Sequence, residues 1–347
     1  MNPKIQRPFL PQPQVSHAGF TLVEIMVGLT IGMLAAIVIM QVFSVFEAQK
    51  RTTTGTADAQ TNGSIALYNI GRELQLAGYP LVANGEPNVA DSAIECAVLT
   101  VNGAVDMTTP NRLSPLAITD GVSDTITIRY GNSNAGGIPT LITGVGNPTA
   151  NDLTLGTNFG CQPGDTTLII NGTNCAMSSI PQFASAVSPS GIVPQTVNVT
   201  DTTGAIPGLN FSCLGNWNAV TYTANNGNLE RNGVPSVAGV VNLQAQYGIS
   251  ATANSNQVVQ WVDASSATGW NLPTVANRNR IKAIRIAVVA RNSKTEPENV
   301  TTAALNAWQG GPVIDLSASD PDWQRYRYRI FETILPLRNV IWAKDTL

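Results

Sequence analysis

The feature that most constrains this sequence is an uninterrupted apolar stretch from Phe20 to Phe46. It contains one charged residue, Glu24, and as an α-helix it would be about 40 Å long at ~1.5 Å per residue. The hydrocarbon core of a bilayer is roughly 30 Å thick, so a helix of this length can span it. We therefore expect a single membrane-spanning helix near the amino terminus.

The segment before this stretch, residues 1–19, is polar and rich in proline. It carries Lys4 and Arg7 but no acidic residue, and it cannot form a core helix. Because basic residues tend to stay on the cytoplasmic side of a membrane, we expect the segment in the cytoplasm and the chain after Glu47 outside.

The order of these two segments is the reverse of that in an ordinary secretory signal, whose apolar stretch precedes the cleavage site and is removed with it. Here the polar segment ends in Gly19, and the run Phe20-Thr21-Leu22-Val23-Glu24 opens the apolar stretch. This arrangement resembles the class III signal of type IV pilins and pseudopilins. The resemblance implies that a prepilin peptidase cuts after Gly19 and methylates the new terminal Phe20. Pilin leaders often have basic residues beside the glycine, whereas this one has Ser16-His17-Ala18.

Glu24 needs a partner, because a carboxylate at mid-membrane costs about 2.5 to 3.5 kcal/mol on insertion scales. The pilin resemblance implies that it pairs with the positive amino terminus of Phe20 on a neighbouring subunit. The simpler alternative is a side chain that reaches the membrane surface. Gly28 and Gly32 form a G-x-x-x-G motif that allows close helix packing, although glycine pairs are also common in membrane helices without that role.

Helical periodicity continues beyond the apolar stretch through Ile65, Ile70 and Leu74. We expect one helix over residues 20–79 that stops at Gly78-Tyr79-Pro80, and a bend or frayed segment in the Thr- and Gly-rich part from Thr52 to Gly63.

Beyond Pro80 the sequence changes to short β-type runs separated by Gly, Asn, Pro and Ser. The predicted strands are 125–130, 196–200 and 220–223, with three longer strands, 240–249, 281–290 and 326–337, forming the main sheet. The resulting fold class is α+β. A long amino-terminal helix packs on an antiparallel β-sheet head, residues 80–347, as the pilin resemblance also implies. Insertions between Ile94 and Val220 enlarge the head.

The four cysteines, Cys96, Cys161, Cys175 and Cys213, lie beyond the apolar stretch and form no C-x-x-C motif. Two disulfides in an exported domain are the simplest interpretation. A Cys161–Cys175 bridge would close a short loop and leave Cys96–Cys213 as the second bridge. Three pairings exist for four cysteines, and the sequence does not choose among them.

Composition argues against several functional classes. The net charge of −3 and the pI near 5.2 supply no broad basic field for nucleic acid. The only histidine is His17, within the predicted leader, so a mature chain would lack the usual general base and zinc ligand. The scattered loop aspartates match no calcium-loop motif. We therefore expect no catalytic residues, no metal and no cofactor.

One basic pattern has two interpretations. Arg325, Arg327 and Arg329 alternate with aromatic and apolar residues, which in a strand places the arginines on one face. That face would either be solvated or bind an acidic partner or nucleic acid.

Three carboxy-terminal blocks extend the resemblance. The segments 241–249, 281–291 and 335–339 are similar to those of the PilW family of minor pilins. This family resemblance implies a role in priming type IV pilus assembly, possible placement at the tip, and support of twitching, adhesion or DNA uptake. The implied partners are major and minor pilins, prepilin peptidase, the inner-membrane assembly machinery and the lipid bilayer. The implied location is the bacterial inner membrane and then the pilus. The alternative is a minor pseudopilin of a type II secretion system.

Overall fold

A computed structural model describes residues 19–81, 96–108, 112–146, 151–181, 195–318 and 320–342. The predicted leader, apart from Gly19, lies outside these ranges. The chain divides into two compact units, Met1–Thr54 and Gly55–Leu347. We call them the amino-terminal unit and the globular unit and describe each by itself.

A single helix, α1 (Leu22–Leu74), contributes to both units. It runs without interruption through the Thr- and Gly-rich segment, so the helix is not frayed there, which was one of the two expectations for it. The helix also ends before the predicted stop at Gly78. Turns carry the chain from Leu74 to Pro80, and Gly78, with φ of +79°, donates its N–H to the carbonyl of Arg129 at 2.8 Å.

The carboxy-terminal part of α1 packs through a line of small residues. Gly55, Ala59 and Gly63 are buried at intervals of one helical turn, and Ala66 and Ile70 continue the same face. A Cβ placed on Gly63 would collide with the ring of Phe331. The glycines therefore serve close packing of the helix against the sheet.

The three longer predicted strands do share one sheet, as expected. Its order is β15-β14-β16-β19, and all neighbours are antiparallel. The strands are β14 (Val240–Ser250), β15 (Val258–Val262), β16 (Ile281–Arg291) and β19 (Tyr328–Pro336). One face of this sheet packs with α1 in the main hydrophobic core, where Leu243, Ile284 and Ile286 are fully buried.

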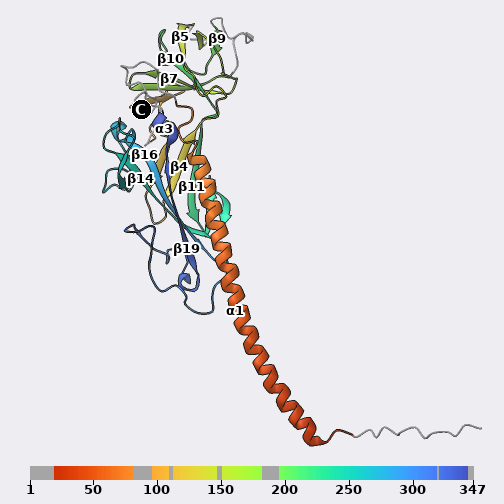
Figure 1. Cartoon of the computed structure of the whole chain (residues 1–347). Coiled ribbons are helices and arrows are strands. Elements are labelled where there is room, and N and C mark those ends of the chain that lie inside the picture. The colour runs from red at the N-terminus through yellow and green to blue at the C-terminus, as the bar shows by residue number, and fades with distance from the viewer. Residues whose placement is uncertain are drawn as a thin grey trace, which may run out of the picture. The chain divides into compact units, whose positions relative to one another are not determined.

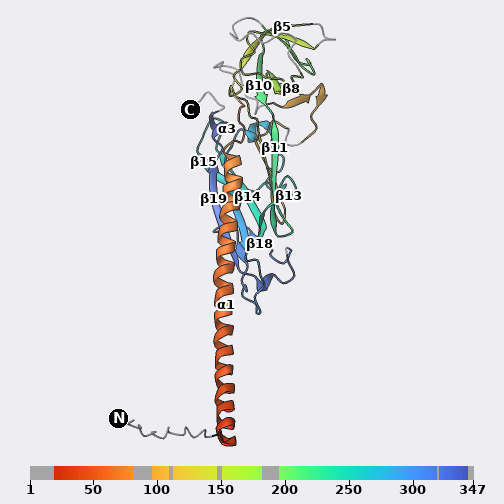
Figure 2. The same ribbon diagram turned by 90° about the vertical axis from the view of Figure 1, so that its right-hand side faces the viewer.

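A second, five-stranded sheet contributes to the same core and has the order β13-β12-β11-β4-β3. Its strands are β3 (Leu116–Thr119), β4 (Thr125–Tyr130), β11 (Asn218–Asn225), β12 (Asn228–Arg231) and β13 (Val234–Ala238). The period-two pattern of β4 puts Ile126 and Ile128 inward, as the sequence predicts. Figures 1 and 2 both show β11 and β14 beside the upper part of α1.

The remaining large sheet has eight strands, which we call the inserted lobe. They are β1 (Val98–Val101), β2 (Ala104–Val105), β5 (Thr140–Val145), β6 (Asp152–Leu155), β7 (Thr166–Asn171), β8 (Asn174–Ser179), β9 (Gln195–Asn198) and β10 (Asn210–Gly215). Most of these strands come between β4 and β11 in the sequence, where an insertion was predicted. The lobe has a core of its own, which includes Ile142, Leu155 and Phe211. Figure 2 shows β5, β8 and β10 gathered at one end of the globular unit.

Short elements complete the globular unit: α2 (Val275–Arg278), β17 (Leu305–Asn306), β18 (Val313–Ile314), η2 (Trp323–Arg325) and α3 (Arg338–Trp342). The predicted arginine face does not form, because the strand begins only at Tyr328. Arg325 lies in η2, Arg327 forms an ion pair with Glu296 at 2.9 Å, and Arg329 is exposed.

Both disulfides join distant parts of the inserted lobe and its entry segment. They link Cys96 to Cys175 and Cys161 to Cys213. The Cys161–Cys175 bridge that sequence proximity suggested is therefore wrong. The reason is strand pairing: β1 runs parallel to β8 with Leu99 opposite Cys175, which brings the start of β1 to that cysteine. The fold as a whole confirms the α+β class, with a long amino-terminal helix against antiparallel sheets.

Candidate membrane and assembly segment

The start of α1 is held by a reciprocal set of hydrogen bonds between Thr21 and Glu24. Thr21 donates its backbone N–H and its hydroxyl to Oε2 of Glu24, at 2.9 and 3.0 Å, and the N–H of Glu24 donates to the Thr21 hydroxyl oxygen at 3.2 Å. This is a capping box, in which the first residue before a helix and the third residue within it satisfy each other's N–H groups. The Thr-x-x-Glu spacing signals this cap, although we expected Glu24 only as a charge in need of a partner.

The apolar part of α1 is exposed on every side within the amino-terminal unit. Phe20 is 85% exposed and Phe43 is 71% exposed. Among the described residues, α1 is the helix long and apolar enough to cross a membrane, and none of its most apolar window is buried. Exposing apolar surface to water costs about 25 cal/mol of free energy per Å². Together with the two disulfides, this exposed surface indicates a membrane anchor with an extracytoplasmic globular unit.

The predicted packing motif lies within this exposed surface. No atom of the described residues comes within 4 Å of a Cβ built on Gly28 or on Gly32. Both positions are therefore open to a second helix, and their role in packing stays a prediction. Phe20, predicted as the new terminus, and Gly19 are likewise exposed.

Farther along α1, a buried ion pair fixes the helix to the five-stranded sheet. Nε and a terminal nitrogen of Arg231 on β12 donate to Oε1 of Glu73 at 2.9 and 2.7 Å. The side chain of Glu73 is 8% exposed, whereas that of Arg231 is 42% exposed. Because Glu73 and Arg231 are far apart in the sequence, only the packing of α1 on the sheet reveals this pair.

A buried carboxyl group joins the turn before β4 to β14. Oδ1 of Asp124 accepts the N–H of Gly121 at 3.1 Å, and Oδ2 accepts the N–H of Ala245 at 2.7 Å. Burial raises the pKa of Asp124 to about 7, against the opposing effect of these two hydrogen bonds, and the nearby charges of Asp120 and Asp263 add to the rise. The geometry is that of a structural link between the turn and β14.

The part of the chain that the structure describes contains no candidate metal site. No three His, Cys, Asp or Glu side chains come together there in a way that would hold a metal ion. The four cysteines are all engaged in disulfides.

The family comparison concerns the second half of the globular unit. Residues 200–339 match the family model of PilW, the type IV pilus-assembly protein W. This part of the chain is a PilW domain. It begins just before β10 and ends in α3, so it contains the whole four-stranded sheet. No curated protein and no solved structure matches the chain significantly.

The PilW domain confirms the family resemblance drawn from segments 241–249, 281–291 and 335–339. Those segments are β14, β16 and the end of β19 with the start of α3, and they lie side by side in one sheet or directly after it. The match does not include α1 or most of the inserted lobe. The capping box and the exposed apolar surface lie outside the matched residues, so they are observations independent of the match.

Proposed function

We propose that this chain is a minor pilin that primes assembly of a type IV pilus at the inner membrane and occupies the pilus tip. The observation that carries the proposal is the presence, in one chain, of an exposed apolar helix and a PilW domain. The helix would supply the part of the subunit that enters the filament, and the domain would supply contacts to other minor pilins. Twitching, adhesion or DNA uptake would depend on it indirectly.

Processing is the first step of the proposed pathway. A prepilin peptidase would cut after Gly19 and methylate the amino group of Phe20. All atoms of the capping box belong to Thr21 and Glu24, so the start of the helix stays intact after this cut. The mature chain would thus begin with a positive charge one residue before a well-capped helix.

Glu24 would then pair with the amino terminus of a neighbouring subunit. The capping box uses Oε2, and within the described ranges Oε1 accepts no hydrogen bond. One oxygen is therefore available for a second partner while the other holds the helix start. A neighbour's amino group would neutralise the carboxylate in the apolar filament core, where an unpaired charge is costly.

Two variants separate capping from charge pairing. Glu24→Gln keeps an acceptor oxygen for the capping box, in which glutamine can replace glutamate, but it removes the charge. Thr21→Val removes the cap and keeps the charge. We expect Glu24→Gln to insert into the membrane yet enter filaments poorly, whereas Thr21→Val should retain most incorporation. Quantifying each variant in sheared pili and in membranes tests this, and normal incorporation of Glu24→Gln would defeat the pairing.

The alternative, a minor pseudopilin of a type II secretion system, shares the leader and the helix. The PilW match favours the pilus. Deleting the gene should reduce surface pili and leave exoprotein secretion unchanged. The opposite pattern, intact pili with blocked secretion, would support the pseudopilin.

A further inference from the structure

A cavity of about 460 Å³ lies where the inserted lobe meets the five-stranded sheet. Val101 on β1 and Met177 on β8 come from the lobe, and Arg129 on β4 comes from the sheet. Trp217, in the connection from β10 to β11, closes the gap between them. The volume falls in the range of small-molecule sites, roughly 300–1,000 Å³.

The charge of the cavity wall is positive. Among the lining residues are Arg112 and Arg129, and none of the lining residues is acidic. Asp106 forms an ion pair with Arg112, 3.4 Å from its Nε, but its side chain is only 1% exposed and is therefore not accessible to a ligand. A ligand entering the cavity therefore meets two guanidinium groups and no carboxylate of the described chain.

Arg129 is the less compensated of the two. It donates one hydrogen bond, to the carbonyl of Ser114 at 3.1 Å, and within the described residues no carboxylate comes within ion-pair distance of it. Burial lowers the pKa of this guanidinium, although the charge of Asp106 opposes the effect. An arginine remains protonated in such a site. A partly buried charge without a carboxylate favours an anion that comes from outside.

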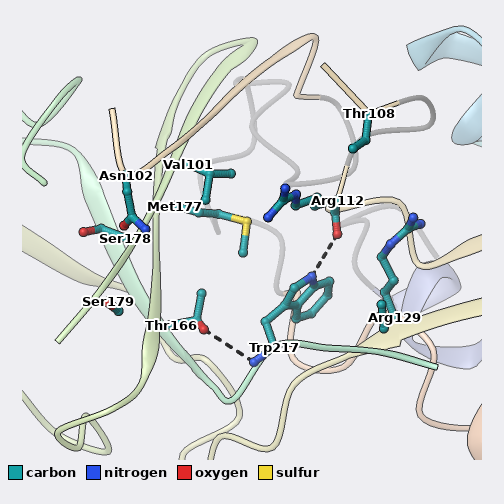
Figure 3. Close-up of a pocket in the computed structure, with 11 residues that line it drawn as sticks. Val101, Asn102, Thr108, Arg112, Arg129, Thr166, Met177, Ser178, Ser179 and Trp217 are labelled. Carbon is teal, nitrogen blue, oxygen red and sulfur yellow. Dashed lines mark hydrogen bonds between the residues drawn. The ribbon is translucent and has the colours of Figure 1, made fainter. Parts of the chain in front are cut away.

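The middle of the cavity is apolar and rigid. The indole N–H of Trp217 donates to the carbonyl of Arg112 at 2.8 Å, which fixes the ring, and its backbone N–H reaches the Thr166 hydroxyl at 3.5 Å. Figure 3 shows Met177 and Arg112 directed toward each other beside this ring, with Arg129 at the opposite end from Ser178 and Ser179. A fixed indole offers its face to a flat or apolar group.

We propose that this cavity binds a carboxylate that carries an aromatic or other flat apolar group. The carboxylate accepts hydrogen bonds from Arg129 and from the free edge of Arg112, whose planar donors match its two oxygens. The apolar group lies on Trp217 and Met177. The carboxylate can belong to a free metabolite or to an acidic side chain beside an aromatic residue in a polypeptide.

The test is calorimetric titration of the full chain in detergent with 3-phenylpropanoate and with its neutral amide. The acid should bind and the amide should bind at least about tenfold more weakly, a difference of ~1.4 kcal/mol. Arg129→Gln should abolish that preference. The exposed Arg329→Gln is the matched control, and it should change nothing. Equal affinity for acid and amide, or unchanged affinity in Arg129→Gln, would overturn the proposal.

Two further arms complete the design. Arg112→Gln alters a side chain that is 55% exposed, and circular dichroism checks its folding because the change also removes the cation beside Asp106. Weakened binding is required of this folded variant even if Arg129→Gln proves unstable. N-acetyl-aspartyl-phenylalaninamide, titrated in parallel, assigns the source: tighter binding than 3-phenylpropanoate points to a polypeptide, and weaker binding points to a free carboxylate. Inorganic phosphate binding as tightly as either acid would contradict the role of the apolar wall.

Discussion

The two parts of α1 have the same backbone conformation but opposite surfaces. From Leu22 to Phe46, large apolar side chains cover the helix, and they are exposed on every side within the described part of the chain. From Gly55 to Leu74, the buried face begins with Gly55, Ala59 and Gly63, and the helix is part of a core. The amino-terminal part therefore requires an apolar environment that the globular unit does not provide.

The difference also separates the energetic roles of the two parts. The globular unit buries its apolar residues in three clusters of its own. The amino-terminal part leaves its side chains exposed and gains stability only from lipid or from neighbouring helices. A substitution between Gly55 and Leu74 should therefore change the stability of the globular unit. A substitution in the amino-terminal part of α1 should change only assembly.

Gly63→Leu should have the largest effect, because any side chain at this position meets the ring of Phe331. We expect a loss of about 3 kcal/mol in the free energy of unfolding of the globular unit, the upper range for overpacking. Denaturant unfolding in detergent measures it. Gly32→Leu is the matched control and should leave that free energy unchanged, since no atom lies within 4 Å of its Cβ. Partial rescue of Gly63→Leu by Phe331→Ala would confirm the contact.

The pH dependence of stability should belong to the globular unit and depend on Asp124. Its folded pKa of about 7 lies above the ordinary value of 3.8, so the folded state binds an extra proton between these values. The stability from this group is then greatest below pH ~4 and is lost as pH rises through ~7. Asp124→Asn should flatten the curve. An unchanged slope in that variant would exclude the buried carboxyl as its source.

Breaking the Glu73–Arg231 pair should have a moderate effect. Arg231→Gln leaves a buried carboxylate without its cation, and because Arg231 is 42% exposed we expect about 1–2 kcal/mol of destabilisation. The control is Arg51→Gln, which removes an exposed pair with Glu47 in the other part of the helix and should change less than about 0.5 kcal/mol. Equal losses of stability from Arg231→Gln and Arg51→Gln would show that the two parts of α1 do not differ in their contribution to the stability of the globular unit.

Thr21→Val should have the smallest effect. Losing a helix cap costs about 1 kcal/mol locally, and the change lies in the amino-terminal unit. Hydrogen exchange should increase at the first turn of α1 and stay the same in the globular unit. Increased exchange in β14 or β16 would mean that the two units are energetically coupled.

The sequence predicted those features that depend on local pattern. The apolar helix and the strands β4, β14 and β16 follow from continuous periodicity in hydrophobic residues, and each appears at nearly the predicted bounds. The same reasoning misread the segment from Thr52 to Gly63. Small residues there were interpreted as flexible, whereas they are small because Phe331 and Asn292 lie against them.

Features that depend on contacts between distant segments could not be predicted from local sequence pattern. The disulfide pairing follows from the parallel alignment of β1 with β8, and the partner of Glu73 lies on β12. The cavity beside Trp217 is formed by segments that are far apart in the sequence, from Val101 to Ala219. The capping box, in contrast, was present in the sequence as Thr-x-x-Glu and could have been predicted from it.

The central claim is that α1 stays attached to the globular unit after the leader before it is removed. Mass spectrometry of the amino-terminal peptide of the protein extracted from membranes tests this directly. We expect a peptide that begins with N-methylated Phe20 and continues through the apolar stretch. A chain that still begins at Met1, or one that has lost the stretch from Phe20 to Phe46, would contradict the account.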